Sequence, residues 1–393
     1  MGSLISKRYQ VITAGICALI LCVGIARFAY TPFLPIMLEQ TSLTSLMGGW
    51  LASFNYIGYL CGLLLISSMS HLKTKYWFYR LNLILAVLST LLMAVTTNVV
   101  MWSVLRFMAG VSSTAGIILA AGFVMSWLKQ NGFKASLGIH FSGLGLGIAI
   151  PGLVIFMLSP YLNWSEQWWV IGLFGLLFFF PAWFFMPHPA AQINITTSNI
   201  SVNKTWMRLM IAAYACAGVG YVISATFIVA IIEAMPSMTG KGSLLWVILG
   251  IAAIPSCFFW DAVASRIGES QAIFIAYLIM LISIVIPIFS QGLMLNIIGA
   301  LLFGGTFAGV VSLMLVYVGH KFPANPAKAM AKLTISYGIA QLIAPAIAGY
   351  LSTLTGSYHS ALWMAAIVMV IGLILVSQFQ RHERYINTEA PSS

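Results

Sequence analysis

The stretch Gly24-Ile-Ala-Arg-Phe-Ala-Tyr-Thr-Pro-Phe-Leu-Pro35 places an arginine, Arg27, inside a long apolar segment. A charge near the middle of a bilayer costs about 2.5–3.5 kcal/mol on insertion scales, so such a residue normally faces a protein interior or a water-filled cavity. Pro32 and Pro35 follow, and each lacks the backbone N–H that would bond to an earlier carbonyl. Inside a membrane, carbonyls that lack this bond must accept a hydrogen bond from a neighbouring group or from water. The stretch therefore predicts a membrane helix with a polar cavity beside it.

The composition places the whole chain in a membrane. Its 393 residues are 61% hydrophobic and only 6% charged, whereas soluble proteins have about a quarter charged residues. A membrane-spanning helix needs about 20 apolar residues, and the spacing of the apolar runs predicts an all-α protein with twelve transmembrane helices. We expect these helices near residues 11–38, 47–70, 76–97, 99–126, 135–158, 167–186, 205–233, 242–264, 270–290, 292–320, 328–353 and 359–380.

The longest polar interruption, 187–204, is rich in Asn, Ser and Thr. It predicts a linker between a first bundle over 1–186 and a second bundle over 205–393, which ends in a short tail. Asn194, Asn199 and Asn203 match the N-glycosylation pattern. The distribution of charge puts this linker on the cytoplasmic side, so we expect no glycan there.

The net charge of +11 is a signal of topology rather than of nucleic-acid binding. Of the 18 lysines and arginines, Arg27 and Arg106 fall inside helices and Lys241 falls in an outer loop; all the others lie at alternate gaps or at the termini. Basic residues accumulate on the cytoplasmic side of membrane proteins. An even number of spans with both termini in the cytoplasm follows.

Several classes of site are not expected. The five cysteines lie within apolar runs without metal-ligand spacing, which favours buried thiols that act as small hydrophobic groups. We find no Gly-rich phosphate loop, no zinc-protease motif and no catalytic triad spacing. The sequence predicts no cofactor, no metal and no enzymatic activity, and a monomer that binds lipid and a small molecule.

The two halves of the sequence match weakly at an offset of about 195 residues. Such a repeat between two six-helix halves is typical of transporters, whose substrate site lies where the repeats meet, near the middle of the membrane. The pairs that carry the match are Gly24 with Gly220, Gly110 with Gly305, Lys134 with Lys328, Ser142 with Ser336, and Pro151 with Pro345.

These features together resemble the major facilitator superfamily (MFS), and within it the YbfB/YjiJ-like branch. The resemblance rests on the first-helix stretch quoted above, on Gly220-Tyr-Val-Ile-Ser-Ala-Thr-Phe227, on Arg106 with Gly110, and on a fifth-helix motif at Gly143, Gly147, Pro151 and Gly152. The cytoplasmic signature of the superfamily is eroded to Trp260-Asp-Ala-Val-Ala-Ser-Arg-Ile-Gly268. The resemblance implies two rocking bundles, alternating access and a multi-pass protein of a bacterial inner membrane; Asp261 and Arg266 are implied gating residues.

Arg27 and Arg106 are the main candidates for substrate binding. At about 1.5 Å per residue, both lie at similar depth in the outer half of the membrane, and no carboxylate in the sequence lies close enough to neutralise them easily. Guanidinium binds carboxylate in a bidentate geometry, so two such groups favour an anionic substrate. The structural alternatives are that Arg106 bonds to backbone carbonyls, and that Arg27 snorkels or caps carbonyls.

Further candidates lie on the helices that face the interface of the halves. His140 is a candidate for proton coupling, because imidazole titrates near neutral pH; a satisfied structural histidine is the alternative. Tyr30, Asn55, Tyr59, Tyr221, Tyr337 and Gln341 are candidate substrate contacts, although aromatic residues also pack cores.

The sequence therefore predicts a secondary active transporter for a small organic anion, favouring a carboxylate, with proton coupling. The alternative with the same fold is an exporter of amphipathic drugs or of a metabolite such as a siderophore. A membrane enzyme or a transporter-like sensor is disfavoured, since no catalytic spacing and no soluble domain is found.

Overall fold

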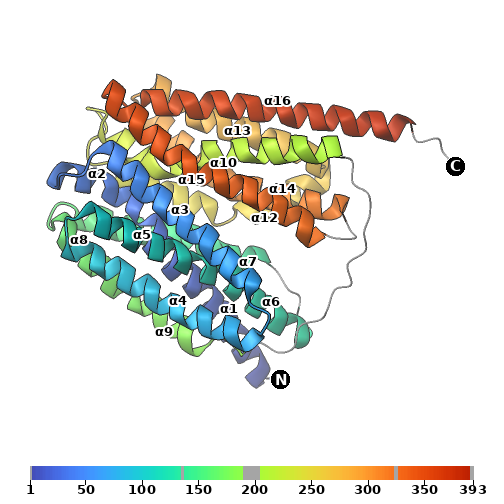
Figure 1. The fold of residues 1–393 in the computed structure, drawn as a ribbon, viewed down its shortest axis with the longest axis horizontal. Coiled ribbons are helices and arrows are strands. Elements are labelled where there is room, and N and C mark those ends of the chain that lie inside the picture. The colour runs from blue at the N-terminus through green and yellow to red at the C-terminus, as the bar shows by residue number, and fades with distance from the viewer. Residues whose placement is uncertain (1, 134–136, 189–203, 323–325, 390–393) are drawn as a thin grey trace.

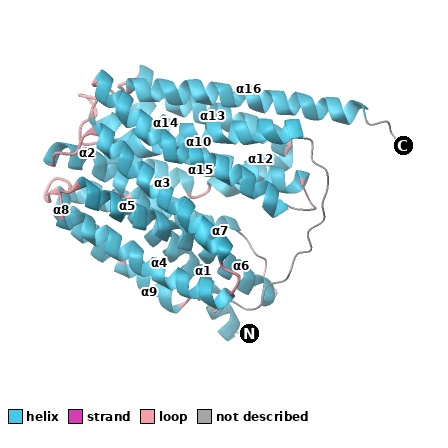
Figure 2. Cartoon of the chain, in the orientation of Figure 1, coloured by secondary structure: helices cyan, strands magenta, loops and turns pink. Residues whose placement is uncertain are grey.

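The computed structural model describes residues 2–133, 137–188, 204–322 and 326–389. These residues form helices joined by short loops, with no strand among them (Figure 2). Eleven helices in the described parts are long and apolar enough to cross a membrane; a bent pair brings the number to twelve if it is one span. The expectation of an all-helical membrane protein is confirmed.

The first half of the chain lies on one side of the molecule and the second half on the other (Figure 1). The first half consists of α1 (Gly2–Leu19), η1 (Ile20–Phe28), α2 (Tyr30–Gln40), α3 (Ser45–Ser68), α4 (Leu72–Leu92), η2 (Met93–Val95), α5 (Val99–Thr114), η3 (Ala115–Ala120), α6 (Ala121–Gln130), α7 (Leu137–Leu158), α8 (Trp164–Phe174) and α9 (Leu176–Phe184).

The second half consists of α10 (Lys204–Glu233), α11 (Gly242–Ala253), α12 (Ser256–Ile267), α13 (Glu269–Phe289), α14 (Leu293–Lys321), α15 (Pro326–Thr355) and α16 (His359–Glu389). The apolar runs located most helix ends to within a few residues. The first and last helices are longer than expected, because hydropathy marks the part of a helix that suits lipid and not the polar turns that continue it into water. The glycosylation patterns at Asn194, Asn199 and Asn203 lie outside the described residues.

The eighth expected helix, 242–264, is not one straight helix. α11 and α12 meet at an angle of 47°, and the break contains Pro255. Pro255 has no N–H to donate to the carbonyl of Ile251, which accepts a bond from Ile254 instead, at 3.2 Å. The proline was present in the expected helix, so the bend had a signal in the sequence.

Two segments of π-helix interrupt the first half. η1 contains Arg27, and the N–H of Ala29 bonds to the carbonyl of Gly24 at 2.8 Å, five residues back. η3 lies in the fourth span between α5 and α6. π-helical turns are rare and often mark functional positions. In η1 the wider turn places the backbone of Ala26 and Arg27 within reach of another helix, as described below.

Glycines set the closest helix contacts inside each half. A Cβ atom on Gly110 of α5 would overlap the carbonyl oxygen of Asn55 on α3, and one on Gly304 of α14 would overlap that of Leu249 on α11. The two contacts join equivalent helix pairs of the repeat. Gly304, rather than the Gly305 paired with Gly110 in the sequence alignment, therefore makes the equivalent contact.

The halves meet along two pairs of helices that the repeat also relates. A Cβ on Gly49 of α3 would overlap the carbonyl of Pro345 on α15, while a Cβ on Gly250 of α11 would lie 2.5 Å from the backbone nitrogen of Ala149 on α7. Helices α3 and α15 are the second and eleventh spans, and α7 and α11 belong to the fifth and eighth spans. A repeat of six spans relates the second span to the eighth and the fifth to the eleventh. The repeat predicted from the sequence is therefore visible in the packing of the halves.

Replacing Gly110 by alanine is expected to destabilise the protein by about 1–3 kcal/mol, because the added methyl overlaps backbone and overpacks the α3–α5 contact. The matched control is Gly305→Ala, where no heavy atom lies within 4 Å of the added Cβ. Alanine favours a helix over glycine by about 1 kcal/mol, so the control should be neutral or stabilising. Thermal unfolding of the purified variants measures both; equal losses would contradict the assigned contact.

Candidate functional site

Arg27 lies on the face of the first span that packs against the other helices. Its side chain is buried, with 6% of its surface exposed. The guanidinium carbon lies 4.4 Å from the centre of the Tyr56 ring and 5.3 Å from that of Tyr59, both on α3. The Nε atom has no hydrogen-bond partner. Aromatic faces thus stabilise this charge, and no acidic side chain among the described residues pairs with it.

Arg106 lies close to the same stretch but is engaged with its backbone. Its Nη1 donates to the carbonyl of Ala26 at 3.0 Å and its Nη2 to the carbonyl of Arg27 at 3.2 Å. In a π turn the carbonyl of Arg27 would bond to the N–H of residue 32, which is a proline and has none. Arg106 therefore supplies donors to carbonyls that the irregular first span leaves available.

Two of the predicted substrate contacts belong to this Arg106 arrangement. The hydroxyl of Tyr30 donates to the carbonyl of Gly48 at 3.0 Å, and the Tyr30 ring centre lies 4.3 Å from the Arg106 guanidinium carbon. The Nδ2 of Asn55 donates to the carbonyl of Arg106 at 2.9 Å. Tyr30 and Asn55 thus join helices of the first half around Arg106.

Tyr59, Tyr221 and Tyr337 are brought together with Arg27. Tyr221 and Tyr337 come from α10 and α15 of the second half, and both lie within electrostatic reach of Arg27. The Tyr221 and Tyr337 rings are 5.9 Å apart and 22° from parallel. Tyr337 also stacks on Tyr214 at 4.5 Å, and Tyr221 stacks on Phe307 at 5.3 Å. Near-parallel rings therefore form a column across the second half.

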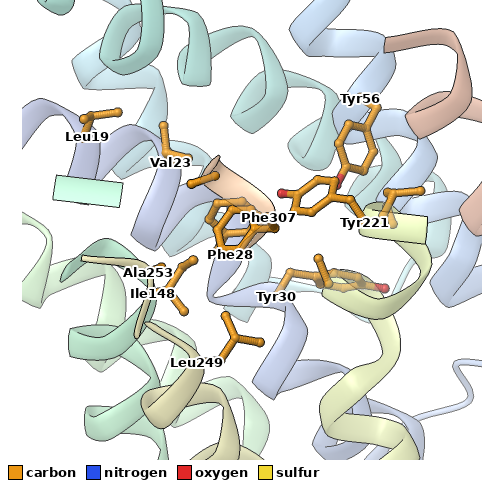
Figure 3. Close-up of a cluster of buried hydrophobic side chains, with 14 of the residues drawn as sticks. Leu19, Val23, Phe28, Tyr30, Tyr56, Ile148, Tyr221, Leu249, Ala253 and Phe307 are labelled. Atoms are coloured by element: carbon orange, nitrogen blue, oxygen red, sulfur yellow. The ribbon is translucent and has the colours of Figure 1, made fainter. Parts of the chain in front are cut away.

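We call this set the aromatic junction, since its members come from both halves of the chain. The two halves also touch through Phe28 and Trp246, whose ring centres are 6.2 Å apart, and through Thr31, whose Oγ1 donates to the carbonyl of Ala225 at 2.6 Å. Figure 3 shows members of both halves in one buried cluster. The aromatic junction consists of Phe28, Tyr56, Tyr59, Tyr214, Tyr221, Phe303, Phe307 and Tyr337.

Several of these aromatic residues were missed in the sequence, although a signal was present. Tyr56 precedes the predicted contact Tyr59 by three residues, Tyr214 precedes Tyr221 by seven, and Phe303 precedes Phe307 by four. Such spacings put residues on one face of a helix. The predicted Gln341 follows Tyr337 by the same four residues on α15, and it is 3% exposed.

His140 on α7 contacts the second π-helix, η3. Its Nε2 lies 3.1 Å from the carbonyl of Gly116. A carbonyl only accepts, so Nε2 carries the hydrogen and Nδ1 of the neutral ring is the free acceptor. Nδ1 is buried without a partner and faces Gly15 of α1, where a Cβ would lie 2.7 Å from it. The imidazole thus joins three helices and keeps one nitrogen that is able to take up a proton.

The implied gating residues Asp261 and Arg266 are both exposed on α12. A hydrogen bond between His320 Nδ1 on α14 and Glu269 Oε1 on α13, at 2.7 Å, joins the two helices that follow α12. The described residues contain no group of three His, Cys, Asp or Glu side chains that would hold a metal. Cys17 and Cys22 are buried as expected, but Cys61, Cys216 and Cys257 are only partly buried.

A small cavity with room for about one water molecule, roughly 10 Å³, lies within the second half. Ser224 Oγ and Asn296 Oδ1 contribute to its lining, and neither has a partner. Its size and its lining of neutral polar atoms suit a structural water, and it lies apart from Arg27.

Comparison with known proteins identifies the relatives of this arrangement. Residues 19–377 match the family described as uncharacterised MFS-type transporter YbfB. The chain is 22% identical over 286 residues to the uncharacterized MFS-type transporter YybF of Bacillus subtilis, covering 70% of this chain and 68% of that protein. It is 26% identical over 121 residues to the uncharacterized transporter mfc1 of Schizosaccharomyces pombe, covering 30% of this chain and 24% of that protein.

Solved structures share the fold at low identity. The nucleoside transporter NupG superposes with a TM-score of 0.76 at 12% identity, covering 95% of this chain and 98% of that one. A bacterial homologue of the human lysosomal transporter Spinster, in an inward-facing and unoccupied conformation, superposes with a TM-score of 0.66 at 13% identity, covering 95% and 96%.

Proposed function

The chain belongs to the YbfB family of the major facilitator superfamily, and on this basis we propose that it transports a small organic anion, a carboxylate, which binds at Arg27. The family makes it an MFS-type transporter with the fold of alternating access. The proposal concerns the substrate, and one observation carries it: a buried guanidinium without an acidic partner lies at the meeting of the two halves. A substrate bound there contacts both halves, as alternating access requires.

The charge at Arg27 supports an anion over other ligands. A buried charge is costly unless it is paired or hydrogen-bonded, and Arg27 lies among aromatic rings without an acidic partner among the described residues. Of the acidic side chains that the structure describes, Glu39, Glu166, Glu233 and Glu269 lie near helix ends, and Asp261 is exposed in the middle of α12. A carboxylate that entered the junction would supply the missing partner in bidentate geometry.

The aromatic junction gives limited support to the alternative function, an exporter of amphipathic compounds or of a metabolite such as a siderophore. Stacked rings accept flat apolar molecules of many kinds. Cationic drugs fit poorly, because Arg27 repels them and no carboxylate among the described interior residues attracts them. An exported compound would therefore be neutral or anionic.

A thermal-shift screen of the purified protein at two pH values tests the proposal. Ligands that bind the folded state raise its unfolding temperature by mass action. We expect carboxylates to raise it, and amides and amines of the same size to leave it unchanged. Stabilisation by neutral amphipathic drugs in place of acids would favour the exporter, and stabilisation by amines would contradict both functions. If no acid changed the unfolding temperature, the assignment of an anionic substrate would be contradicted.

We place proton coupling at His140, whose free Nδ1 is buried against α1. Gly15 and Gly116 lie in the same half as His140, so a movement of α7 against α1 within this half would let Nδ1 exchange a proton. Replacing His140 by glutamine is expected to abolish substrate accumulation driven by a pH gradient, while exchange of labelled for unlabelled substrate at equal pH continues. Glutamine retains an amide donor for the Gly116 carbonyl. Loss of both activities, or of neither, would contradict a role in coupling.

The orientation follows from charge. Twelve spans, with the bent pair counted as one, place both chain ends on one side of the membrane, and the basic residues of the sequence concentrate at that side of the spans. By the positive-inside rule, we infer that both ends face the cytoplasm, in the inner membrane of a bacterium. The protein works as a monomer in this proposal, because the aromatic junction is completed by the two halves of a single chain.

A further inference from the structure

The number of available charges at the junction limits the charge of the substrate. Arg27 and Arg106 are the two guanidiniums inside the described spans near the junction. Arg106 already donates to the carbonyls of Ala26 and Arg27. Moving it onto a substrate would leave two buried carbonyls without those donors, which is unfavourable. Arg27 therefore remains as the group for a ligand, and it balances one negative charge.

Arg27 keeps one donor without a partner, since its Nε is buried and makes no hydrogen bond. Its guanidinium lies over the rings of Tyr56 and Tyr59, and such contacts use the face of the planar group. The N–H groups of guanidinium point outward in its plane, where a carboxylate binds with two parallel hydrogen bonds. The tyrosines thus stabilise the charge, and the unpaired Nε is the donor that we assign to the substrate.

The surroundings of that edge are aromatic. The rings of Tyr221 and Phe307 are 21° from parallel with centres 5.3 Å apart, and Phe303 continues the stack with its ring only 5° from the plane of Tyr221. All three are less than 6% exposed. Near-parallel rings prefer a flat, offset aromatic partner to a puckered aliphatic one.

We propose that the substrate is a planar aromatic monocarboxylate, whose carboxylate pairs with Arg27 and whose ring stacks on Tyr221 and Phe307. This inference rests on the anion transport proposed above and narrows its substrate. A second carboxylate would lie buried among aromatic rings without a cation, which is costly. A sugar acid would need partners for its hydroxyls, and Asn55, the amide nearest to Arg106, already bonds to backbone.

Four small probes separate the parts of the proposal. Benzoate carries the flat ring and one charge. Cyclohexanecarboxylate keeps the charge and size but loses planarity, terephthalate adds a second charge, and benzamide removes the charge. Binding to the purified full-length protein is measured by calorimetry. We expect benzoate to bind about tenfold more tightly than cyclohexanecarboxylate, from the loss of one or two ring contacts, and we expect no binding of terephthalate or benzamide.

Variants test where the ring binds. Tyr221→Leu should weaken benzoate binding about tenfold and leave the affinity for cyclohexanecarboxylate unchanged, because only the flat ligand gains from stacking. Tyr221→Phe keeps the ring and should bind benzoate as the natural protein does, which also guards against a folding defect in the leucine variant. Phe289→Leu is the control, since Phe289 is 72% exposed on α13.

The outcomes distinguish this inference from the function on which it rests. If benzoate and cyclohexanecarboxylate bind equally, and Tyr221→Leu affects neither, the aromatic substrate is wrong while anion binding stands. If neither acid binds, or if benzamide binds as tightly as benzoate, the anion site at Arg27 is wrong as well. Tight binding of terephthalate would show that a second cation is available and would overturn the charge count.

Discussion

Arg27→Gln is expected to abolish binding of carboxylates and leave the protein folded. A charge-assisted contact between guanidinium and a buried carboxylate contributes about 3 kcal/mol, which corresponds to roughly a hundredfold in Kd. Glutamine keeps a polar amide, but it is two bonds shorter than arginine and carries no charge. Calorimetry with benzoate measures the loss.

The stability of the Arg27→Gln variant should not fall with its affinity for carboxylates. Arg27 is a buried charge with no acidic partner among the described residues, and strain of this kind at a binding site is maintained for function. The glutamine variant should therefore unfold at an equal or higher temperature. Arg27→Lys is the matched control: it retains the charge but not the fork of donors, so binding should weaken without vanishing. Unchanged affinity in Arg27→Gln would remove this residue from the site.

Arg106→Gln is expected to have the opposite signature, a large loss of stability. Its guanidinium donates to the carbonyls of Ala26 and Arg27 and lies over the ring of Tyr30. Removing a charged donor from buried carbonyls costs about 3 kcal/mol. The apparent unfolding temperature in detergent should fall well below that of the natural protein.

The lysine variant again separates charge from geometry. One ammonium reaches a single carbonyl more readily than two neighbouring ones, so Arg106→Lys should recover only part of the lost stability. Variants that remain folded should keep their preference for carboxylates, since Arg106 bonds to backbone rather than to substrate. If Arg106→Gln were as stable as the natural protein and bound no acid, the roles of the two arginines would be reversed.

The contrast between the two arginines arises from the irregular first span. A regular α-helix bonds its own carbonyls internally, and a membrane offers no water to those that are left over. Residues 20–28 are π-helical and are followed by Pro32, so the backbone near Arg27 accepts bonds from another helix. Arg106 meets that need. Arg27, on the same irregular turn, keeps an unpaired Nε and is the group that we propose for the ligand.

The sequence alone was sufficient for the class and outline of the fold. Apolar runs of about 20 residues can cross a bilayer only as helices, so their number and approximate ends follow from composition. The internal repeat and the positions of Gly110, Gly143 and Pro151 resemble the superfamily, and residues 19–377 match its YbfB family. The bend at Pro255 also had a local cause in the sequence.

Only the tertiary structure assigned the partners of the polar groups. Arg27 and Arg106 look alike in the sequence, each one charge in an apolar run, because hydropathy records the cost of burial and not the atoms that offset it. The carbonyls bonded by Arg106 lie about 80 residues away along the chain, and Tyr221 lies almost 200 residues from Arg27. Contacts over such separations depend on how the two halves pack, and that packing determines which arginine holds the helices together and which faces the aromatic junction.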